Sequence, residues 1–269
     1  MIKAALALIV LIVIITLLVR MVESRFAFFP LAGETVTPGQ FGVQHDALSI
    51  ETEDGEKLRA WAMGHPAPRA HIVYFHGNGG NLSIWAPILA EIARQRYSVT
   101  AFDYRGYGSS TGHPTERGLY RDVDAVLERF WSGSPPKTPV VYWGRSLGAT
   151  MAAYAATVRA PNGLILESAF PDVRTLVRSS PPMALLALFS TYRFPAAAFL
   201  QRGKAPGVPV LVMHGDEDRV VPIGQGQALF EQIPGPKRFF TIRGGDHNDA
   251  APRDARAYWE AVDGFIGGL

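Results

Sequence analysis

The stretch VVYWGRSLGAT, residues 140–150, joins an apolar run to a run of small residues, with a serine between two glycines at the junction. The apolar part is typical of a buried strand, and the continuation ATMAAYAAT, residues 149–157, is typical of a helix. A Gly-x-Ser-x-Gly turn between a strand and a helix projects the serine hydroxyl above the sheet, and small neighbours permit its strained backbone. We therefore predict that Ser146 is a nucleophile. The alternative is a helix N-cap serine flanked by unrelated glycines.

A serine nucleophile needs a general base, and the base needs an acid that fixes its tautomer. His247 is the candidate base because it follows the last predicted strand, in the glycine-rich loop of TIRGGDHNDA, residues 241–250. The other histidines lie in turns or at strand edges. The candidate acids follow the penultimate predicted strand and are Asp216, Glu217 and Asp218. The order along the chain is then serine, acid, histidine.

Attack on a carbonyl also needs hydrogen-bond donors for the oxyanion that develops. The glycine-rich stretch YFHGNGGN, residues 74–81, follows a predicted strand and offers backbone N–H groups. We predict that the N–H groups of Asn78 and Leu147 form this oxyanion hole. The alternatives are a flexible turn or a phosphate-binding loop, but the stretch lacks G-K-[ST] and G-x-G-x-x-G. A second glycine-rich stretch, DYRGYGSS at residues 103–110, is interpreted as a turn braced by its own Asp and Arg.

Short apolar runs alternate with helical patterns from residue 44 to residue 269, the range of the predicted folded domain. A hairpin turned at Asp54-Gly55 comes first, and the runs that follow are HIVYFHG, SVTAFDY, PVVYWG, GLILESA, PVLVMHG and RFFTIRGG. Most of these runs are apolar on both faces, which is typical of strands buried between two helix layers. The pattern predicts an α/β fold with a largely parallel sheet. Residues 171–206 interrupt the alternation with a segment too long and apolar for a simple crossover.

The N-terminus carries an uncharged, largely apolar run, Ala4–Val19, bracketed by Lys3 and Arg20. With its flanking residues this run approaches the length of a membrane-spanning helix. We predict an uncleaved transmembrane anchor over residues 1–22, with the side of the membrane undetermined, because basic residues lie at both ends. A cleaved signal peptide is the first alternative and a buried helix the second. Residues 23–43 are rich in Pro, Gly and Thr and are predicted to be a linker.

The composition excludes some classes of metal site, nucleophile and binding partner. There is no cysteine, so thiolate metal sites and cysteine nucleophiles are excluded. The 26 Lys and Arg nearly balance the 24 Asp and Glu, and no dense basic block is present, so nucleic acid is not an expected partner. No metal, organic cofactor or obligate protein partner is implied.

The chain resembles the α/β-hydrolase superfamily and, more narrowly, the membrane-anchored serine hydrolases of the BEM46 type. The motifs that carry the resemblance are FHGNGGN, DYRGYGSSTG, GRSLGAT, LESAF, HGDEDRVVP and GGDHND, in the family's order. It implies the α/β-hydrolase fold, with a mostly parallel eight-stranded sheet flanked by helices. It assigns Asp218 as the acid and His247 as the base, with Asp246 an additional residue in the histidine loop. It also implies that residues 171–206 are a small helical lid for an acyl chain; ordinary packing of short helices is the alternative.

These observations predict a serine esterase, lipase or thioesterase with a Ser146-His247-Asp218 triad that acts through an acyl-enzyme. A lipophilic acyl ester or thioester, as a small molecule or a lipid, is the expected substrate because the predicted lid is apolar and the predicted anchor would hold the site near a bilayer. Amide or peptide hydrolysis and acyl transfer are the catalytic alternatives. A membrane-anchored scaffold with a disabled site is the non-catalytic alternative. A dehalogenase is disfavoured because it would carry Asp at the position of Ser146.

Overall fold

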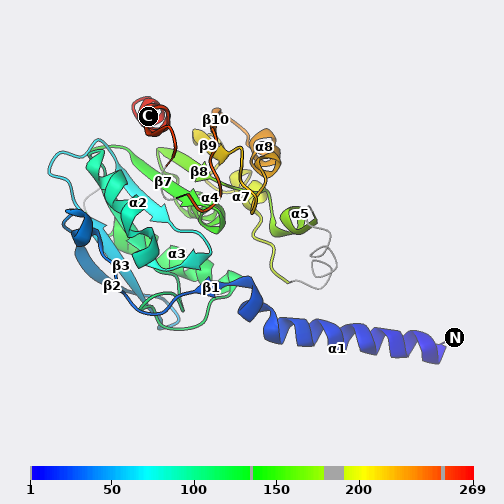
Figure 1. Ribbon diagram of the computed structural model, residues 1–269. Helices are drawn as coiled ribbons and strands as arrows, with labels where there is room; N and C mark the ends of the chain where they lie inside the picture. Colours follow the sequence, from blue (N-terminus) through cyan, green and yellow to red (C-terminus); the bar gives the residue numbers. More distant parts are fainter. Residues whose placement is uncertain (1, 134–135, 179–190, 250–251) are drawn as a thin grey trace.

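The computed structural model describes residues 2–133, 136–178, 191–249 and 252–269. The strands are β1 (Phe29–Pro30), β2 (Asp46–Glu51), β3 (Lys57–Met63), β4 (His71–Phe75), β5 (Gly79–Gly80), β6 (Ser98–Phe102), β7 (Val140–Arg145), β8 (Gly163–Glu167), β9 (Val210–Gly215) and β10 (Lys237–Ile242). The helices are α1 (Ile2–Ala27), η1 (Pro38–Phe41), α2 (Leu82–Arg94), α3 (Glu116–Trp131), α4 (Leu147–Val158), α5 (Val173–Arg178), α7 (Ala196–Leu200), α8 (Ile223–Gln232) and α9 (Ala255–Ile266). Figure 1 shows their arrangement.

The central sheet has eight strands in the order β10-β9-β8-β7-β4-β6-β3-β2. The strands from β10 to β6 pair in parallel, whereas β3 is antiparallel to both β2 and β6. The sheet is therefore mixed: five of its seven strand pairings are parallel, as expected of a largely parallel sheet, and the two pairings of β3 are antiparallel. The reason is the turn at Asp54 and Gly55, where Gly55 has a φ of 84° and closes β2 and β3 into the predicted hairpin.

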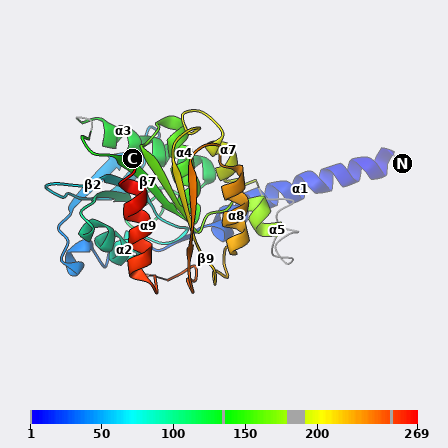
Figure 2. The same cartoon turned by 90° about the horizontal axis from the view of Figure 1, so that it is seen from above.

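Helices cover both faces of the sheet, as the doubly apolar strands predict (Figure 2). Side chains of β7 alternate between two cores: Val140 and Tyr142 belong to one, and Val141 and Trp143 to the other. The first core includes residues of α3, α4, α7 and α8, and the second includes residues of α2 and α9. The parallel register also brings the loops that follow β4, β7, β8, β9 and β10 to one edge of the sheet.

Helix α1 projects away from the folded domain (Figure 1). It continues past residue 22, where the predicted anchor ends, and takes in Glu23 and Arg25. Within the described residues, no helix combines the length and the apolar character needed to cross a bilayer. The predicted transmembrane anchor over residues 1–22 is therefore not supported.

The predicted linker, residues 23–43, is attached to the domain instead of hanging free. Strand β1 pairs in parallel with β5, so that Phe29 lies opposite Gly79. Leu31 extends this pairing, because its N–H donates to the Gly80 carbonyl at 2.9 Å. We refer to residues 27–33 as the strap. A composition rich in Pro, Gly and Thr is typical of a linker, but backbone hydrogen bonds can still attach such a segment to the domain.

The predicted lid, residues 171–206, contains α5 and α7. Its apolar stretch PMALLALF, residues 182–189, lies outside the described residues. The part that follows packs on the strap: the rings of Phe28 and Tyr192 are 5.3 Å apart between centroids. The Glu23 carboxylate accepts hydrogen bonds from the Thr191 hydroxyl and the Thr191 N–H. The end of α1 thus lies next to the C-terminal part of the predicted lid.

Candidate active site

Ser146 occupies a strained turn between β7 and α4. Its φ of 55° and ψ of −118° are unusual for a residue with a side chain. A Cβ atom at Gly144 would collide with the Gly148 carbonyl, and one at Gly148 would collide with the Phe75 carbonyl. Both glycines are therefore required by the close approach of α4 to the ends of β7 and β4. The Ser146 N–H donates to the Glu167 carbonyl at 2.8 Å, which ties the turn to the end of β8.

The structure brings together His247 and Asp218, which follow β10 and β9. The His247 Nδ1 atom lies 2.7 Å from Asp218 Oδ2. Asp218 is buried, and its other carboxylate oxygen accepts the N–H groups of Val220 at 3.0 Å and Val221 at 2.7 Å. An imidazole that donates from Nδ1 to a carboxylate can accept a proton at its Nε2 atom. A general base requires this tautomer.

A second histidine faces the same carboxylate. His214 Nε2 lies 3.5 Å from Asp218 Oδ2 and 2.7 Å from the Val221 carbonyl oxygen. Burial opposes ionisation of Asp218, but the hydrogen bonds of His214 and His247 outweigh burial and lower the pKa of Asp218 below its usual range. Asp218 is consequently a carboxylate at neutral pH.

The two other candidate acids are exposed and have different partners. Asp216 accepts the backbone N–H of Gly244 at 2.6 Å, and Glu217 pairs with Arg253 at 3.3 Å. Asp246, the additional residue of the histidine loop, accepts the backbone N–H of His247 at 2.6 Å. These carboxylates therefore shape the loops after β9 and β10, whereas Asp218 contacts the His247 ring.

The predicted oxyanion donors belong to neighbouring loops, because Phe75 of β4 lies opposite Gly144 of β7 in the sheet register. Leu147 is the first residue of α4, so its N–H has no acceptor within that helix. Asn78 makes hydrogen bonds through its side chain and its carbonyl oxygen. Its Nδ2 donates to the Ala27 carbonyl at 2.7 Å, and the Tyr107 hydroxyl lies 2.8 Å from its Oδ1 and 3.0 Å from its carbonyl oxygen.

The Ser146 hydroxyl has no hydrogen bond to any described residue, so the structure does not join it to His247. Apo structures commonly show such catalytic hydrogen bonds as long or unformed. The two loops are nevertheless connected: Arg145, the residue before Ser146, donates from Nη2 to the His247 carbonyl at 2.7 Å.

The stretch DYRGYGSS has structural contacts, in agreement with its interpretation as a braced turn. Asp103 Oδ1 accepts the N–H of Leu82 at the start of α2, at 2.8 Å. Arg105 is buried and pairs with Asp122 at 2.8 Å and with Asp54 at 2.8 Å.

The sequence motifs do not predict two residues of the site. These are Arg145, the variable position of the Gly-x-Ser-x-Gly turn, and Glu167, the last residue of β8. Both are buried. The available signal was a charged residue at the end of each of two otherwise apolar strands. Such residues are rarely fully buried unless they are paired.

Comparisons with known proteins show the family of this chain. Residues 66–207, just over half of the chain, match the family described as serine aminopeptidase, S33. The protein bem46 of Schizosaccharomyces pombe is 30% identical over 245 residues, which cover 86% of this chain and 79% of that protein. An uncharacterized membrane protein of Saccharomyces cerevisiae is 30% identical over 86% of this chain and 82% of its own.

Solved structures show the same fold. The esterase Pf2001 of Pyrococcus furiosus superposes with a TM-score of 0.69 at 18% identity, covering 90% of this chain and 95% of that one. Est1E of Butyrivibrio proteoclasticus, solved with ferulic acid bound, superposes with a TM-score of 0.64 at 20% identity, covering 82% and 98%. At these identities the likeness concerns the fold alone.

Proposed function

The chain belongs to the serine aminopeptidase S33 family of α/β-hydrolases, within which it is of the BEM46 type, and from this premise we propose that it is a serine hydrolase of the esterase class. One observation carries the proposal. A buried Asp218 carboxylate lies 2.7 Å from His247 Nδ1, on loops at the same sheet edge as the strained Ser146 turn. Acyl transfer by a serine requires an acid, a base and a nucleophile close together, and this observation supports that assignment.

In the proposed first half-reaction, the Ser146 hydroxyl oxygen attacks the acyl carbonyl carbon while His247 Nε2 takes the hydroxyl proton. The negative charge that develops on the carbonyl oxygen is stabilised by the N–H groups of Leu147 and Asn78, and α4 contributes the positive end of its dipole. His247 then gives the proton to the leaving alcohol or thiol, and the acyl group remains on Ser146.

In the second half-reaction, His247 takes a proton from water, and the resulting hydroxide attacks the acyl-enzyme carbonyl. The carboxylic acid leaves as the proton returns to Ser146. Asp218 stays ionised throughout, because its pKa lies below its usual range, and its negative charge stabilises the imidazolium that forms in both steps. The proposed reaction uses no metal or organic cofactor.

Exposed apolar side chains near the candidate site favour a lipophilic acyl group as substrate. Phe29 and Leu31, on the strap that pairs with the oxyanion loop, are 61% and 52% exposed. Val220, whose N–H donates to the candidate acid Asp218, is 56% exposed. Covering such surface with an acyl chain releases water from it and contributes about 25 cal/mol per Å². Esters and thioesters share this requirement, and both are proposed substrates.

The second candidate is hydrolysis of a peptide or amide, which the family's description favours. An aminopeptidase needs an anionic group for the substrate's free amino terminus. Asp216 and Glu217, the exposed acids nearest in sequence to Asp218, already have partners in Gly244 and Arg253. Comparing p-nitrophenyl acyl esters of increasing chain length with amino-acid p-nitroanilides separates the two activities. We expect turnover of the esters, rising with chain length.

A fluorophosphonate probe tests the proposal directly. We expect it to label the purified protein at Ser146, as mapped by tandem mass spectrometry, and we expect labelling to disappear in Ser146→Ala and to fall steeply in His247→Ala. Ser110→Ala, outside the candidate triad, is the control and should be labelled like the wild type. A folded wild-type protein that stays unlabelled and hydrolyses no acyl ester would instead favour a non-catalytic scaffold. If acyl-enzyme forms, product analysis with added alcohols distinguishes hydrolysis from acyl transfer.

We also propose that α1 binds the domain to a lipid surface. Apolar side chains such as Leu6 and Ile9 are about 60% exposed on this projecting helix. Large exposed apolar patches mark interaction sites. The related yeast protein is named a membrane protein, which supports the assignment. Cosedimentation with phosphatidylcholine vesicles tests it. Ile12→Glu with Leu17→Glu should abolish binding, whereas Ile84→Glu, an equally exposed position on the folded domain, should not.

A further inference from the structure

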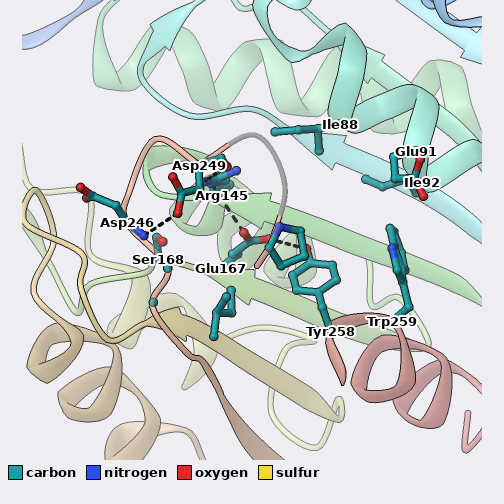
Figure 3. A pocket seen from close by; sticks show the side chains of 14 residues that line it. Ile88, Glu91, Ile92, Arg145, Glu167, Ser168, Asp246, Asp249, Tyr258 and Trp259 are labelled. Carbon is teal, nitrogen blue, oxygen red and sulfur yellow. Dashed lines mark hydrogen bonds and ion pairs between the residues drawn. The ribbon is translucent and has the colours of Figure 1, made fainter. Parts of the chain in front are cut away.

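Arg145 is a charged side chain in a buried position directly before the candidate nucleophile. It is 6% exposed, and its guanidinium lies 5.6 Å from the ring centroid of Trp85. Figure 3 shows it between the loop that carries Asp246 and Asp249 and the side chain of Glu167. Ionised arginine is rarely buried without strong partners, because removal from water is costly. Its partners therefore indicate what it does.

One end of the guanidinium holds the histidine loop. Arg145 Nη2 donates to the carbonyl oxygens of His247 at 2.7 Å and Asp249 at 2.9 Å. One of these carbonyls belongs to His247 itself and the other to the residue two positions further along the chain. Hydrogen bonds from a charged donor are stronger than neutral ones. The residue before the nucleophile is thus joined directly to the backbone of the candidate base.

The other end of Arg145 is held by Glu167. The Glu167 Oε1 atom lies 3.6 Å from Arg145 Nε, and its Oε2 accepts from the Tyr258 hydroxyl at 3.0 Å. The Glu167 carbonyl accepts the Ser146 N–H at 2.8 Å. Burial would lower the pKa of Arg145, but the charge of Glu167 outweighs it, and the pKa of Arg145 lies above its ordinary value. Glu167 therefore secures both the Ser146 backbone and the Arg145 side chain.

The contact of His247 with Asp218 joins the histidine loop to the loop after β9, whereas the hydrogen bonds of Arg145 join it to the end of β7. A cavity of about 60 Å³ lies under the loop, lined by Arg145, Glu167, Asp249, Tyr258 and Trp259 among others (Figure 3). Where packed side chains are missing, backbone position is set by hydrogen bonds. Lysine could not replace the guanidinium, because its point charge lacks the planar set of donors that reaches two carbonyls and a carboxylate together.

We propose that Arg145 is a positioning residue that holds the His247 loop in register with Ser146, so that His247 Nε2 reaches the serine hydroxyl while its Nδ1–H donates to Asp218. This inference rests on the proposed function. The acid sets the tautomer of the base, and Arg145 sets the position of its backbone. A displacement of the reacting groups by about 1 Å lowers catalytic rates by as much as about 100-fold.

The test compares Arg145→Gln and Arg145→Lys with Arg105→Gln in the full chain. Arg105 is a matched control, since it is 5% exposed and pairs with a buried carboxylate, Asp122, at 2.8 Å. For Arg145→Gln we expect kcat toward a p-nitrophenyl acyl ester to fall about 10- to 100-fold, with KM within about twofold. The rate of fluorophosphonate labelling at Ser146 should fall by the same factor. Arg145→Lys should lose most of that activity although it keeps the charge beside Glu167.

Arg105→Gln should lose thermal stability without losing kcat at temperatures where it is folded. In Arg145→Ala, guanidinium ion added below denaturing concentrations should restore part of kcat, since the deleted group leaves a site of its own shape. A merely structural role of Arg145 predicts equal behaviour of the Arg145 and Arg105 variants.

The proposal is overturned if folded Arg145→Gln or Arg145→Lys retains wild-type kcat, or if only KM changes. A failure of the proposed function has a different signature: the wild type itself is then unlabelled, or Ser146→Ala remains active. If Arg145→Gln does not fold, Arg145→Lys and the guanidinium experiment decide between the same two outcomes.

Discussion

The side-chain amide of Asn78 donates a hydrogen bond to the carbonyl oxygen of Ala27, the last residue of α1, at 2.7 Å. The candidate oxyanion loop is thereby attached to the N-terminal helix, far from it in sequence. The Tyr107 hydroxyl contacts the same residue, at the side-chain Oδ1 and at the carbonyl oxygen. The position of the Asn78 N–H thus depends on the strap and on the Tyr107 side chain, in addition to the loop that contains it.

We predict that Tyr107→Phe lowers kcat about 2- to 10-fold, because the lost hydrogen bonds contribute about 0.5–1.5 kcal/mol to the position of Asn78. KM should stay unchanged, since an oxyanion donor acts in the transition state. Steady-state kinetics with a p-nitrophenyl ester measure the effect. Tyr154→Phe, whose hydroxyl contacts Asp124 on the surface of α3, is the control. If folded Tyr107→Phe keeps the kcat of the wild type, the assignment of Asn78 to the oxyanion hole is contradicted.

The second prediction concerns the choice among the three neighbouring acids. Asp218→Asn should lower kcat on the order of 10³- to 10⁴-fold, because the neutral amide no longer fixes the His247 tautomer or stabilises its cation. Glu217→Gln should change kcat less than twofold, since this exposed acid pairs with Arg253. Similar losses in both variants, or none in Asp218→Asn, would contradict the assignment.

The same carboxylate makes stability depend on pH. The pKa of Asp218 in the folded chain lies below its ordinary value of 3.8, and in the unfolded chain it returns to that value. Ionised Asp218 therefore contributes stability in full above about pH 4, and the contribution is lost as the pH falls through the folded-state pKa. We expect the free energy of unfolding to fall more steeply below pH 4 in the wild type than in Asp218→Asn. Urea titrations at several acidic pH values measure both slopes, and parallel slopes would contradict the shift.

Much of the fold follows from periodic apolar patterns. The doubly apolar β7 and β8 predict a sheet covered on both faces, and the turn at Asp54-Gly55 predicts the hairpin that makes the sheet mixed. The strap was not predictable in this way. Phe29–Pro30 pairs with Gly79–Gly80 through backbone atoms, and a two-residue pairing leaves no periodicity in the sequence.

The candidate site residues that could be predicted are those whose residue type and local motif indicate a chemical role. Ser146, Asp218 and His247 lie in loops at predicted strand ends, a setting that favours function over packing. Arg145 and Glu167 act through contacts across the sheet edge, and nothing local in the sequence relates the end of β7 to the loop after β10. Only the fold brings Arg145 to the His247 carbonyl.

Two glycine substitutions should have opposite effects on stability. Gly148→Ala forces a Cβ into the Phe75 carbonyl, and overpacking of this kind destabilises by about 1–3 kcal/mol or more. Gly264 is exposed within α9, and a Cβ there would meet no heavy atom of the described residues within 4 Å apart from its chain neighbours and the backbone of its own helix. Gly264→Ala should stabilise by about 0.5–1 kcal/mol through helix propensity. Denaturant unfolding monitored by circular dichroism gives both values, and a stable Gly148→Ala would show that α4 approaches β4 less closely.

The last prediction separates stability from catalysis at Ser146 itself. Its φ of 55° and ψ of −118° are costly for any residue with a Cβ, by about 1–3 kcal/mol. Ser146→Ala keeps that strain and loses the hydroxyl, whereas Ser146→Gly loses both. The relief of strain in Ser146→Gly is partly offset, because glycine gives the unfolded chain more conformational entropy. This entropy lowers the free energy of unfolding by about 0.5–1 kcal/mol. We therefore expect Ser146→Gly to unfold at a free energy about 1 kcal/mol higher than Ser146→Ala, with both variants inactive. If Ser146→Gly is the less stable of the two, the turn is not strained, and the backbone geometry that presents the nucleophile needs another explanation.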